Sequence, residues 1–201
     1  MTKILFINAC IRGNTVSRTY KLAQHFVSEY KKHHKESLIT QLNLKEMNLT
    51  PLSNDLLNER EELLSKQELD NPVFHLAKQF AEADRIIIAA PFWDLNFPAL
   101  LKIYLENIFI PGITFDYTET GIIGLCKAEK LLFITTRGGF YSFEETRELE
   151  LGSKFMQAMC VMFGINEYHC LDAEGLDIVG ENVEEIMSQA FHRAESLALN
   201  F

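Results

Sequence analysis

The feature that most constrains the fold is an unbroken apolar run between Arg85 and Pro91, which reads Ile-Ile-Ile-Ala-Ala. A strand with apolar side chains on both faces must be covered on both faces, which is typical of a central strand in a parallel sheet. Residues 3–9 and 130–136 are dominated by apolar side chains as well. Because parallel strands are joined by crossovers that usually contain a helix, these runs predict an α/β fold.

Helical patterns alternate with strands along the chain. We expect strands at residues 3–9, 37–44, 85–91, 130–136 and 165–171. We expect helices at residues 16–32, 56–65, 73–82, 97–109, 149–163 and 183–199, and a short hairpin within residues 113–126. This order predicts a doubly wound, five-stranded parallel sheet with strand order 2-1-3-4-5 and right-handed crossovers. With 201 residues and no internal repeat or long linker, the chain is expected to be one domain, residues 1–201.

The charge balance argues against a nucleic-acid partner. Lys and Arg number 19 and Asp and Glu number 28, which gives a net charge of −9. Such a surface repels phosphate backbones. A local phosphate site is still compatible with this charge, because backbone N–H groups bind anions without net positive charge.

The cysteines predict a reducing, cytoplasmic location. Cys10, Cys126, Cys160 and Cys170 show no CxxC spacing, and a chain of this size does not need disulfides for its stability. The apolar run at residues 4–7 is too short for a signal peptide, and no stretch approaches the ~18 apolar residues of a membrane span. No His or Cys pair has the spacing of a metal site, so we expect neither a membrane anchor nor a metal.

Ligands of a doubly wound sheet bind beyond the carboxyl ends of its strands, so three loops become candidates for a site. The first, residues 9–17, carries Arg12, Gly13, Asn14 and several hydroxyls at the start of a helix. It lacks GxGxxG and GxxxxGK[ST], which disfavours a dinucleotide or a triphosphate and favours a single phosphate monoester. The alternative is that Thr15 or Ser17 simply caps the helix.

The other two loops are suited to a flat aromatic ligand. Residues 91–98 place Trp93, the single tryptophan of the chain, between two prolines at a strand end. Aromatic side chains there can flank a planar ring, although a core cluster under the loop is the alternative. Residues 135–143 contain Gly138 and Gly139, which allow a backbone to approach a ligand closely, or else merely form a turn.

Four stretches together resemble the FMN-dependent NADH:quinone oxidoreductase and azoreductase family of flavodoxin-like NAD(P)H dehydrogenases. They are residues 88–91 (IAAP), 92–97 (FWDLNF), 112–119 (GITFDYTE) and 135–139 (TTRGG). The third is the most specific, because nothing in the general fold requires it. The resemblance covers residues 3 to about 198 and implies a flavodoxin-like three-layer sandwich that binds FMN.

Carried over position by position, the resemblance implies two groups of FMN contacts. The phosphate side falls on Cys10, Thr15, Val16 and Ser17. The isoalloxazine side falls on Phe92, Trp93, Asp94, Leu95, Thr136, Arg137, Gly138 and Gly139. Cys10 stands where a serine is common, which replaces a hydroxyl by a weaker thiol donor. Asp94 stands where an asparagine is usual, and an ionised carboxylate beside the flavin would oppose its anionic reduced state.

The resemblance implies a two-step hydride exchange, in which NADH or NADPH reduces FMN and a quinone or an azo compound is then reduced in the same pocket. Because the flavin carries the chemistry, we expect no catalytic side chain. The family is typically dimeric, and the helix at residues 97–109 is apolar almost all round, which favours a homodimer over coverage within one subunit.

Three alternatives remain at this point. An electron-carrying or non-catalytic flavodoxin-like module would bind FMN without turning over NADH. A hydrolase is disfavoured because the chain has no metal cluster and no G-x-S-x-G motif. A phosphatase is disfavoured because the C-x₅-R spacing is absent after Cys10, with Arg12 and Arg18 two and eight residues on.

Overall fold

A five-stranded parallel sheet forms the centre of the computed structural model, which describes residues 1–13 and 15–201. Its strands stand in the order β2-β1-β3-β6-β7. They are β1 (Lys3–Asn8), β2 (Leu38–Asn43), β3 (Arg85–Ala89), β6 (Lys130–Thr136) and β7 (Glu167–Ala173). Counted among the parallel strands alone, this is the predicted order 2-1-3-4-5, which is confirmed.

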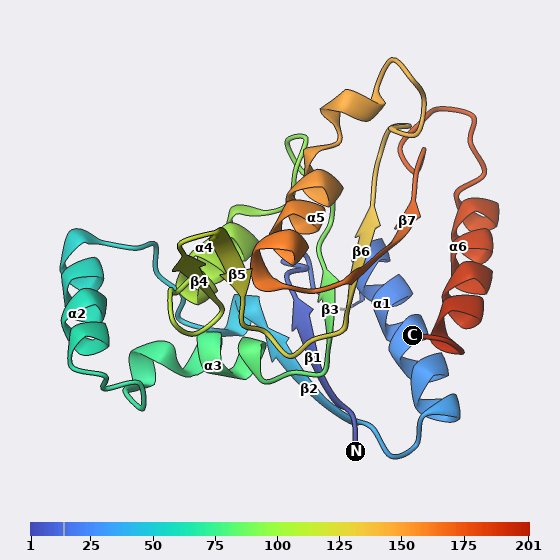
Figure 1. Ribbon diagram of the computed structural model, residues 1–201. Coiled ribbons are helices and arrows are strands. Elements are labelled where there is room, and N and C mark those ends of the chain that lie inside the picture. Colours follow the sequence, from blue (N-terminus) through green and yellow to red (C-terminus); the bar gives the residue numbers. More distant parts are fainter. Residues whose placement is uncertain (14) are drawn as a thin grey trace.

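Helices cover both faces of the sheet, so the predicted three-layer sandwich is confirmed (Figure 1). One face carries α1 (Arg18–His33) and α6 (Val183–Ala198). The other carries α3 (His75–Ala81), α4 (Ala99–Ile108) and α5 (Leu151–Phe163). The helix α2 (Asn54–Ser65) lies outside α4, where Arg60 donates a hydrogen bond of 2.6 Å to the side-chain oxygen of Asn107. Short 3₁₀ turns complete the chain at Leu44–Glu46, Pro72–Phe74 and Arg147–Leu149.

The apolar run of β3 explains why two cores form. Ile86 and Ile88 pack with the side chains of α3, α4 and α5. Ile87 and Ala89 point to the opposite face and pack with α1 and α6. Since successive side chains of a strand alternate between the two faces, only a strand that is apolar at every position can complete both cores.

Two elements, the first helix and the last strand, begin later than expected for local reasons. The first helix begins at Arg18 rather than at residue 16, because the Ser17 side chain accepts a hydrogen bond from the N–H of Tyr20 and caps the helix. The last strand runs two residues later than expected. Gly164 ends α5 in the left-handed conformation (φ 75°), and Ile165 donates its N–H back to Cys160, so the strand cannot start there.

The expected hairpin is present and docks against α5. It consists of β4 (Phe115–Thr118) and β5 (Gly121–Gly124), paired antiparallel. The backbone of Gly124 lies directly against that of Gly164, and the N–H of Cys126 donates to the carbonyl of Phe163 at 3.3 Å. A side chain at Gly124 would overlap the backbone of Phe163 and Gly164.

We therefore expect Gly124→Ala to lower the free energy of unfolding by about 2 kcal/mol or more, because two backbone segments must separate to admit the methyl group. Ile122→Ala, at an exposed position of the same hairpin, is the control and should change it by no more than about 0.5 kcal/mol. Urea unfolding measures both. Equal values for the two variants would contradict the docking of the hairpin.

Candidate functional site

The three loops singled out in the sequence meet at the carboxyl edge of the sheet. The N–H of Phe92 donates to the carbonyl of Thr136 at 3.1 Å, and the hydroxyls of Thr19 and Thr136 are 2.6 Å apart. Between the loops lies a cavity of about 150 Å³. Its lining consists of Ile11, Arg12, Val16, Ser17, Arg18, Thr19, Pro91, Phe92, Trp93, Thr136, Arg137, Gly138, Leu176 and Asp177. The cavity sits at the switch between β1 and β3, where the topology places ligands.

The first loop supplies the helix terminus and the positive charge of the cavity. Ser17, which caps α1, lines the cavity together with the guanidinium-bearing Arg12 and Arg18. Thr15 and Val16 are exposed. Asn14, counted in the predicted anion-binding loop, lies outside the described residues. A helix N-terminus with hydroxyls and arginines beside it suits an anion.

Cys10, expected on the phosphate side, points its side chain into the core. Its thiol is buried, and its Sγ lies 3.7 Å from the carbonyl oxygen of Ala89. Burial raises the pKa of the Cys10 thiol from 9.0 to about 11. The thiol is therefore neutral near pH 7 and does not add negative charge next to an anion.

The loop after β3 is a tight turn with a strained backbone. Trp93 and Asn96 exchange two backbone hydrogen bonds of 2.9 and 2.8 Å around Asp94 and Leu95. Both central residues are left-handed, with φ of 49° and 65°, which costs a residue other than glycine about 1–2 kcal/mol. Trp93 lines the cavity, whereas Asp94 and Leu95 form the exposed tip of the turn. Such strain is typical of functional turns.

The glycine loop after β6 presents free backbone donors. The carbonyls of Arg137, Gly138 and Gly139 accept hydrogen bonds from Leu176, Asp177 and Gly175 respectively. Within residues 1–13 and 15–201, the N–H groups of Gly138 and Gly139 have no protein acceptor. A Cβ at Gly138 would come within 2.5 Å of the Asp177 carboxylate, which would have to move aside. Backbone N–H groups at such a close approach form a cradle for an electronegative ligand.

The side chain of Arg137 turns away from the cavity into a group of carboxylates. Its Nη1 lies 2.6 Å from Asp172 and 2.5 Å from Glu174, and its Nη2 lies 3.6 Å from Glu150. Burial lowers the pKa of Arg137, but the nearby carboxylates and Cys170 outweigh it and raise the pKa overall. The expected isoalloxazine contact at this position is therefore open only to its backbone or the base of its side chain.

Sequence reasoning missed one wall of the cavity, the segment that follows β7. Leu176 and Asp177 line the cavity, and Arg18 donates to the carbonyl of Leu176 at 2.7 Å and to Asp177 at 2.6 Å. The expected strand ended at residue 171. The rule that ligands bind beyond the carboxyl ends applies to this strand too, and its observed end at Ala173 leads directly into the segment.

Five parallel strands in the order 2-1-3-4-5, with donors for an anion at the switch between the first and third strands, are typical of flavodoxin-like α/β proteins. The family model described as flavodoxin-like fold matches residues 2–198. A protein of Coprothermobacter proteolyticus named FMN-dependent NADH:quinone oxidoreductase is 39% identical over 204 residues, with both chains fully covered. An azoreductase from Bacillus anthracis superposes with a TM-score of 0.91 at 28% identity, again over both full chains.

A second structure from Bacillus anthracis, an FMN-dependent NADH-azoreductase in complex with FMN, has a TM-score of 0.87 at 28% identity over 98% of each chain. The chain belongs to the flavodoxin-like family that contains FMN-dependent NADH:quinone oxidoreductases and azoreductases.

No helix formed by residues 1–13 and 15–201 is long and apolar enough to cross a membrane. Across the same residues, no group of three His, Cys, Asp or Glu side chains is placed to hold a metal ion.

The buried thiol of Cys10 gives a testable pH dependence. The unfolded thiol ionises near pH 9 and the folded one near 11, so its contribution to stability is complete below pH 9 and is lost as the pH rises toward 11. Between pH 8.5 and 10.5 the free energy of unfolding should fall by about 1–2 kcal/mol less in Cys10→Ala than in the wild type. Urea unfolding at the two pH values measures this. An identical fall in both proteins would show that the thiol is not buried.

Proposed function

We propose that this chain binds FMN in the cavity at the carboxyl edge and is an NAD(P)H oxidoreductase that reduces quinones, aromatic azo compounds or both. The observation that carries the proposal is the convergence of the capped N-terminus of α1 and the free N–H groups of the glycine loop on one cavity. When bound, FMN supplies the chemistry of accepting a hydride from NADH or NADPH and passing it to the acceptor.

The donor set of the cavity fits FMN at its phosphate end. The first turn of α1, the Ser17 hydroxyl and the guanidinium of Arg12 offer N–H and O–H donors to a phosphate monoester. Arg18 adds positive charge while it holds Asp177. Thr15 belongs to the same proposed end, and Cys10 borders it, with its thiol facing the core and its N–H donating to the Asn8 side-chain oxygen at 3.0 Å.

The donor set also fits the ring end. Phe92 and Trp93 offer aromatic faces, and Gly138 and Gly139 offer backbone N–H groups. The N–H groups of Asp94 and Leu95 are likewise without an acceptor in the described part of the chain. These donors are fixed before the ligand arrives, so they stabilise negative charge that develops on a reduced ring without reorganising.

The protein therefore positions FMN and supplies hydrogen-bond donors to it, and no side chain is proposed as a nucleophile or a general acid. Asp177 is the carboxylate that lines the described cavity wall, and it is held by Arg18.

The visible spectrum of the purified protein with FMN, before and after NADH is added without oxygen, tests the function. Bound flavin bands that bleach on adding NADH are expected. Gly138→Ala should weaken FMN binding about threefold, because its methyl group displaces the Asp177 carboxylate and, with it, the Arg18 side chain that pairs with it at the cavity. Ser142→Ala, in the exposed part of the same loop, should bind FMN as the wild type does.

Two other results would redirect the proposal. Flavin bands that persist with NADH would identify an electron carrier instead of an NADH-dependent enzyme. A wild-type chain that bound no FMN would remove the proposed function while leaving the fold in place.

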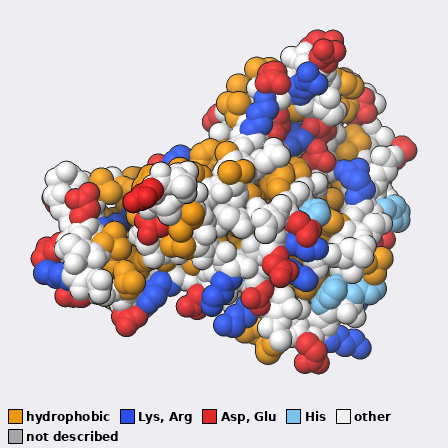
Figure 2. All heavy atoms as spheres, viewed as in Figure 1, with side chains coloured by type: hydrophobic (Ala, Val, Ile, Leu, Met, Phe, Trp, Pro, Cys, Tyr) orange, Lys and Arg blue, Asp and Glu red, His pale blue; other side chains and the backbone are white. Residues whose placement is uncertain are grey.

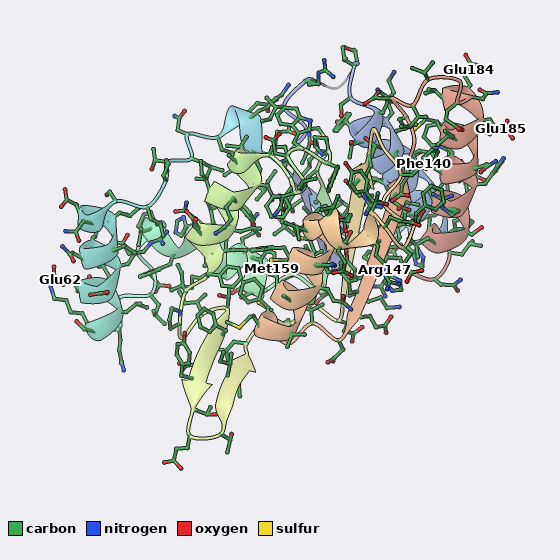
Figure 3. All side chains as sticks on the ribbon, turned by 90° about the horizontal axis from the view of Figure 1, so that it is seen from above. Glu62, Phe140, Arg147, Met159, Glu184 and Glu185 are labelled. Carbon is green, nitrogen blue, oxygen red and sulfur yellow. The ribbon has the colours of Figure 1, made fainter. Side chains whose placement is uncertain are left out.

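We also infer that the protein acts as a homodimer in the cytoplasm. An apolar groove of about 500 Å³ runs between α4 and α5, and hydrophobic side chains gather on this face (Figure 2). Its lining consists of Leu52, Lys102, Glu106, Phe109, Phe155, Ala158, Met159 and Met162. The β4–β5 hairpin projects beyond the body near this face and exposes Tyr117 and Ile122 (Figure 3, where Met159 is labelled on α5).

A second copy of the chain is the occupant that this face suits. Exposed apolar patches of this kind mark contact surfaces, and most soluble homo-oligomers are two-fold dimers.

The four cysteines are all free thiols, which supports a reducing compartment.

Ala158→Glu should convert the dimer into a monomer, because it places a charge in the apolar groove at a position that is exposed in the single subunit. Sedimentation velocity at micromolar concentration measures the change. The control is Leu199→Glu, an exposed apolar position after α6 on the opposite face, which should leave the dimer intact. A wild type that sediments as a monomer would refute the dimer.

A further inference from the structure

Two carboxylates share one guanidinium nitrogen beside the glycine loop. The Nη1 of the buried Arg137 lies 2.6 Å from Asp172 and 2.5 Å from Glu174. Asp172 lies in β7 and Glu174 directly follows it, and the two carboxylates are at similar distances from the same nitrogen. Their other contacts differ, and this difference separates their roles.

The second oxygen of Glu174 holds the loop that follows the two glycines. Its Oε2 accepts hydrogen bonds from the backbone N–H groups of Tyr141 and Ser142, each at 3.1 Å. Asp172 instead turns toward Arg193, which lies 3.6 Å from its carboxylate, and it accepts no hydrogen bond from this loop in the described part of the chain. Glu174 is thus the acid that links Arg137 to the loop.

The loop held by Glu174 forms part of the cavity wall through an aromatic pair. The Tyr141 ring lies 4.5 Å from the ring of Phe92, which lines the cavity. The guanidinium of Arg137 lies 5.9 Å from the centre of the same Phe92 ring. Phe92 therefore contacts both a ring that Glu174 positions through the backbone and a cation that Glu174 pairs with directly.

The neighbouring residues extend this link to the free N–H donors. Gly175, which follows Glu174, donates its N–H to the carbonyl of Gly139 at 3.0 Å. Gly175 also packs against the Phe140 ring so closely that a Cβ there would overlap it. Gly139 and Phe140 are thus both fixed to the segment that begins at Glu174.

We propose that Glu174 is a positioning residue for FMN, holding Gly138–Tyr141 and the Phe92 ring in the geometry that the flavin ring requires. The inference rests on the proposed function, since it concerns the same cavity. Glu174 acts through the loop and makes no contact of its own with the ligand in this account. A carboxylate that accepts two backbone N–H groups while paired with a buried arginine fixes a loop more firmly than either contact alone.

Three variants separate this role from a general contribution to folding. Glu174→Ala removes both the ion pair and the acceptor for the loop. Glu174→Gln keeps an uncharged oxygen acceptor. Asp172→Asn is the matched control, because it removes the other carboxylate from Arg137 and leaves the loop contacts in place.

Two measurements are made on each full-length variant. Hydrogen exchange reports how well the amides of Tyr141 and Ser142 are protected without FMN, and flavin fluorescence titration gives the Kd for FMN. Glu174→Ala should speed exchange of both amides and raise the Kd, each by about tenfold or more, with Glu174→Gln intermediate at about threefold. Asp172→Asn should leave both values near those of the wild type.

The outcomes distinguish the two levels of the proposal. A wild type that binds FMN, with equal exchange rates and Kd values in Glu174→Ala and Asp172→Asn, would overturn the inference alone. Failure of the wild type to bind FMN would overturn the proposed function and this inference together. If Glu174→Ala does not fold, Glu174→Gln is compared with Asp172→Asn: faster exchange at Tyr141 and Ser142 in the former supports the inference, and equal rates overturn it.

Discussion

The burial of both faces of the central strands is the constraint on which the rest of the structure depends. β1, β3 and β6 each carry apolar side chains at nearly every position and so require helices on both sides. Because all the strands of this sheet run parallel, their carboxyl ends lie at one edge. Residues as far apart in the chain as Arg18 and Leu176, which are 158 positions apart, meet there for this reason, and the cavity follows from the packing of the sheet.

At the carboxyl edge of the sheet, the charges that line the cavity affect an anionic ligand more than the net charge of the chain does. The chain carries a net charge of −9, but interactions between exposed charges fade beyond the ~8 Å screening length of physiological salt. Within the cavity, Arg12, Arg18 and backbone N–H groups act at contact distance. An acidic protein can therefore hold an anionic cofactor, and the same acidity disfavours binding to longer polyanions.

The carboxylates around Arg137 serve the site from behind its wall. A buried arginine with acidic partners is a costly arrangement that adds little net stability, because both kinds of charge must leave water. Its value lies in fixed geometry: the ion pairs join β6, β7 and the start of α5 around one guanidinium. The glycine loop begins at that same residue, and Glu174 joins the cluster to the loop through the backbone N–H groups of Tyr141 and Ser142.

The sequence by itself determined the sheet, its order, and the three loops that form most of the cavity. Apolar periodicity reports burial directly, and the carboxyl-end rule converts a strand order into a site. Of the residues that the family resemblance assigned to FMN, the cavity lining contains Val16, Ser17, Phe92, Trp93, Thr136, Arg137 and Gly138, and it does not contain Cys10, Thr15, Asp94, Leu95 or Gly139.

Only the tertiary structure decided which way the side chains point and which segment closes the cavity. Thr136 pairs with Ala173 across β6 and β7, and this register brings Arg137 beside Glu174 although 37 residues separate them. It also brings Leu176 and Asp177 to the cavity wall, while Cys10 turns into the core. The physical reason is that the apolar pattern of a strand reports its own burial. Which residue lies beside which on the neighbouring strand depends on the register, and that is set when the strands pack together.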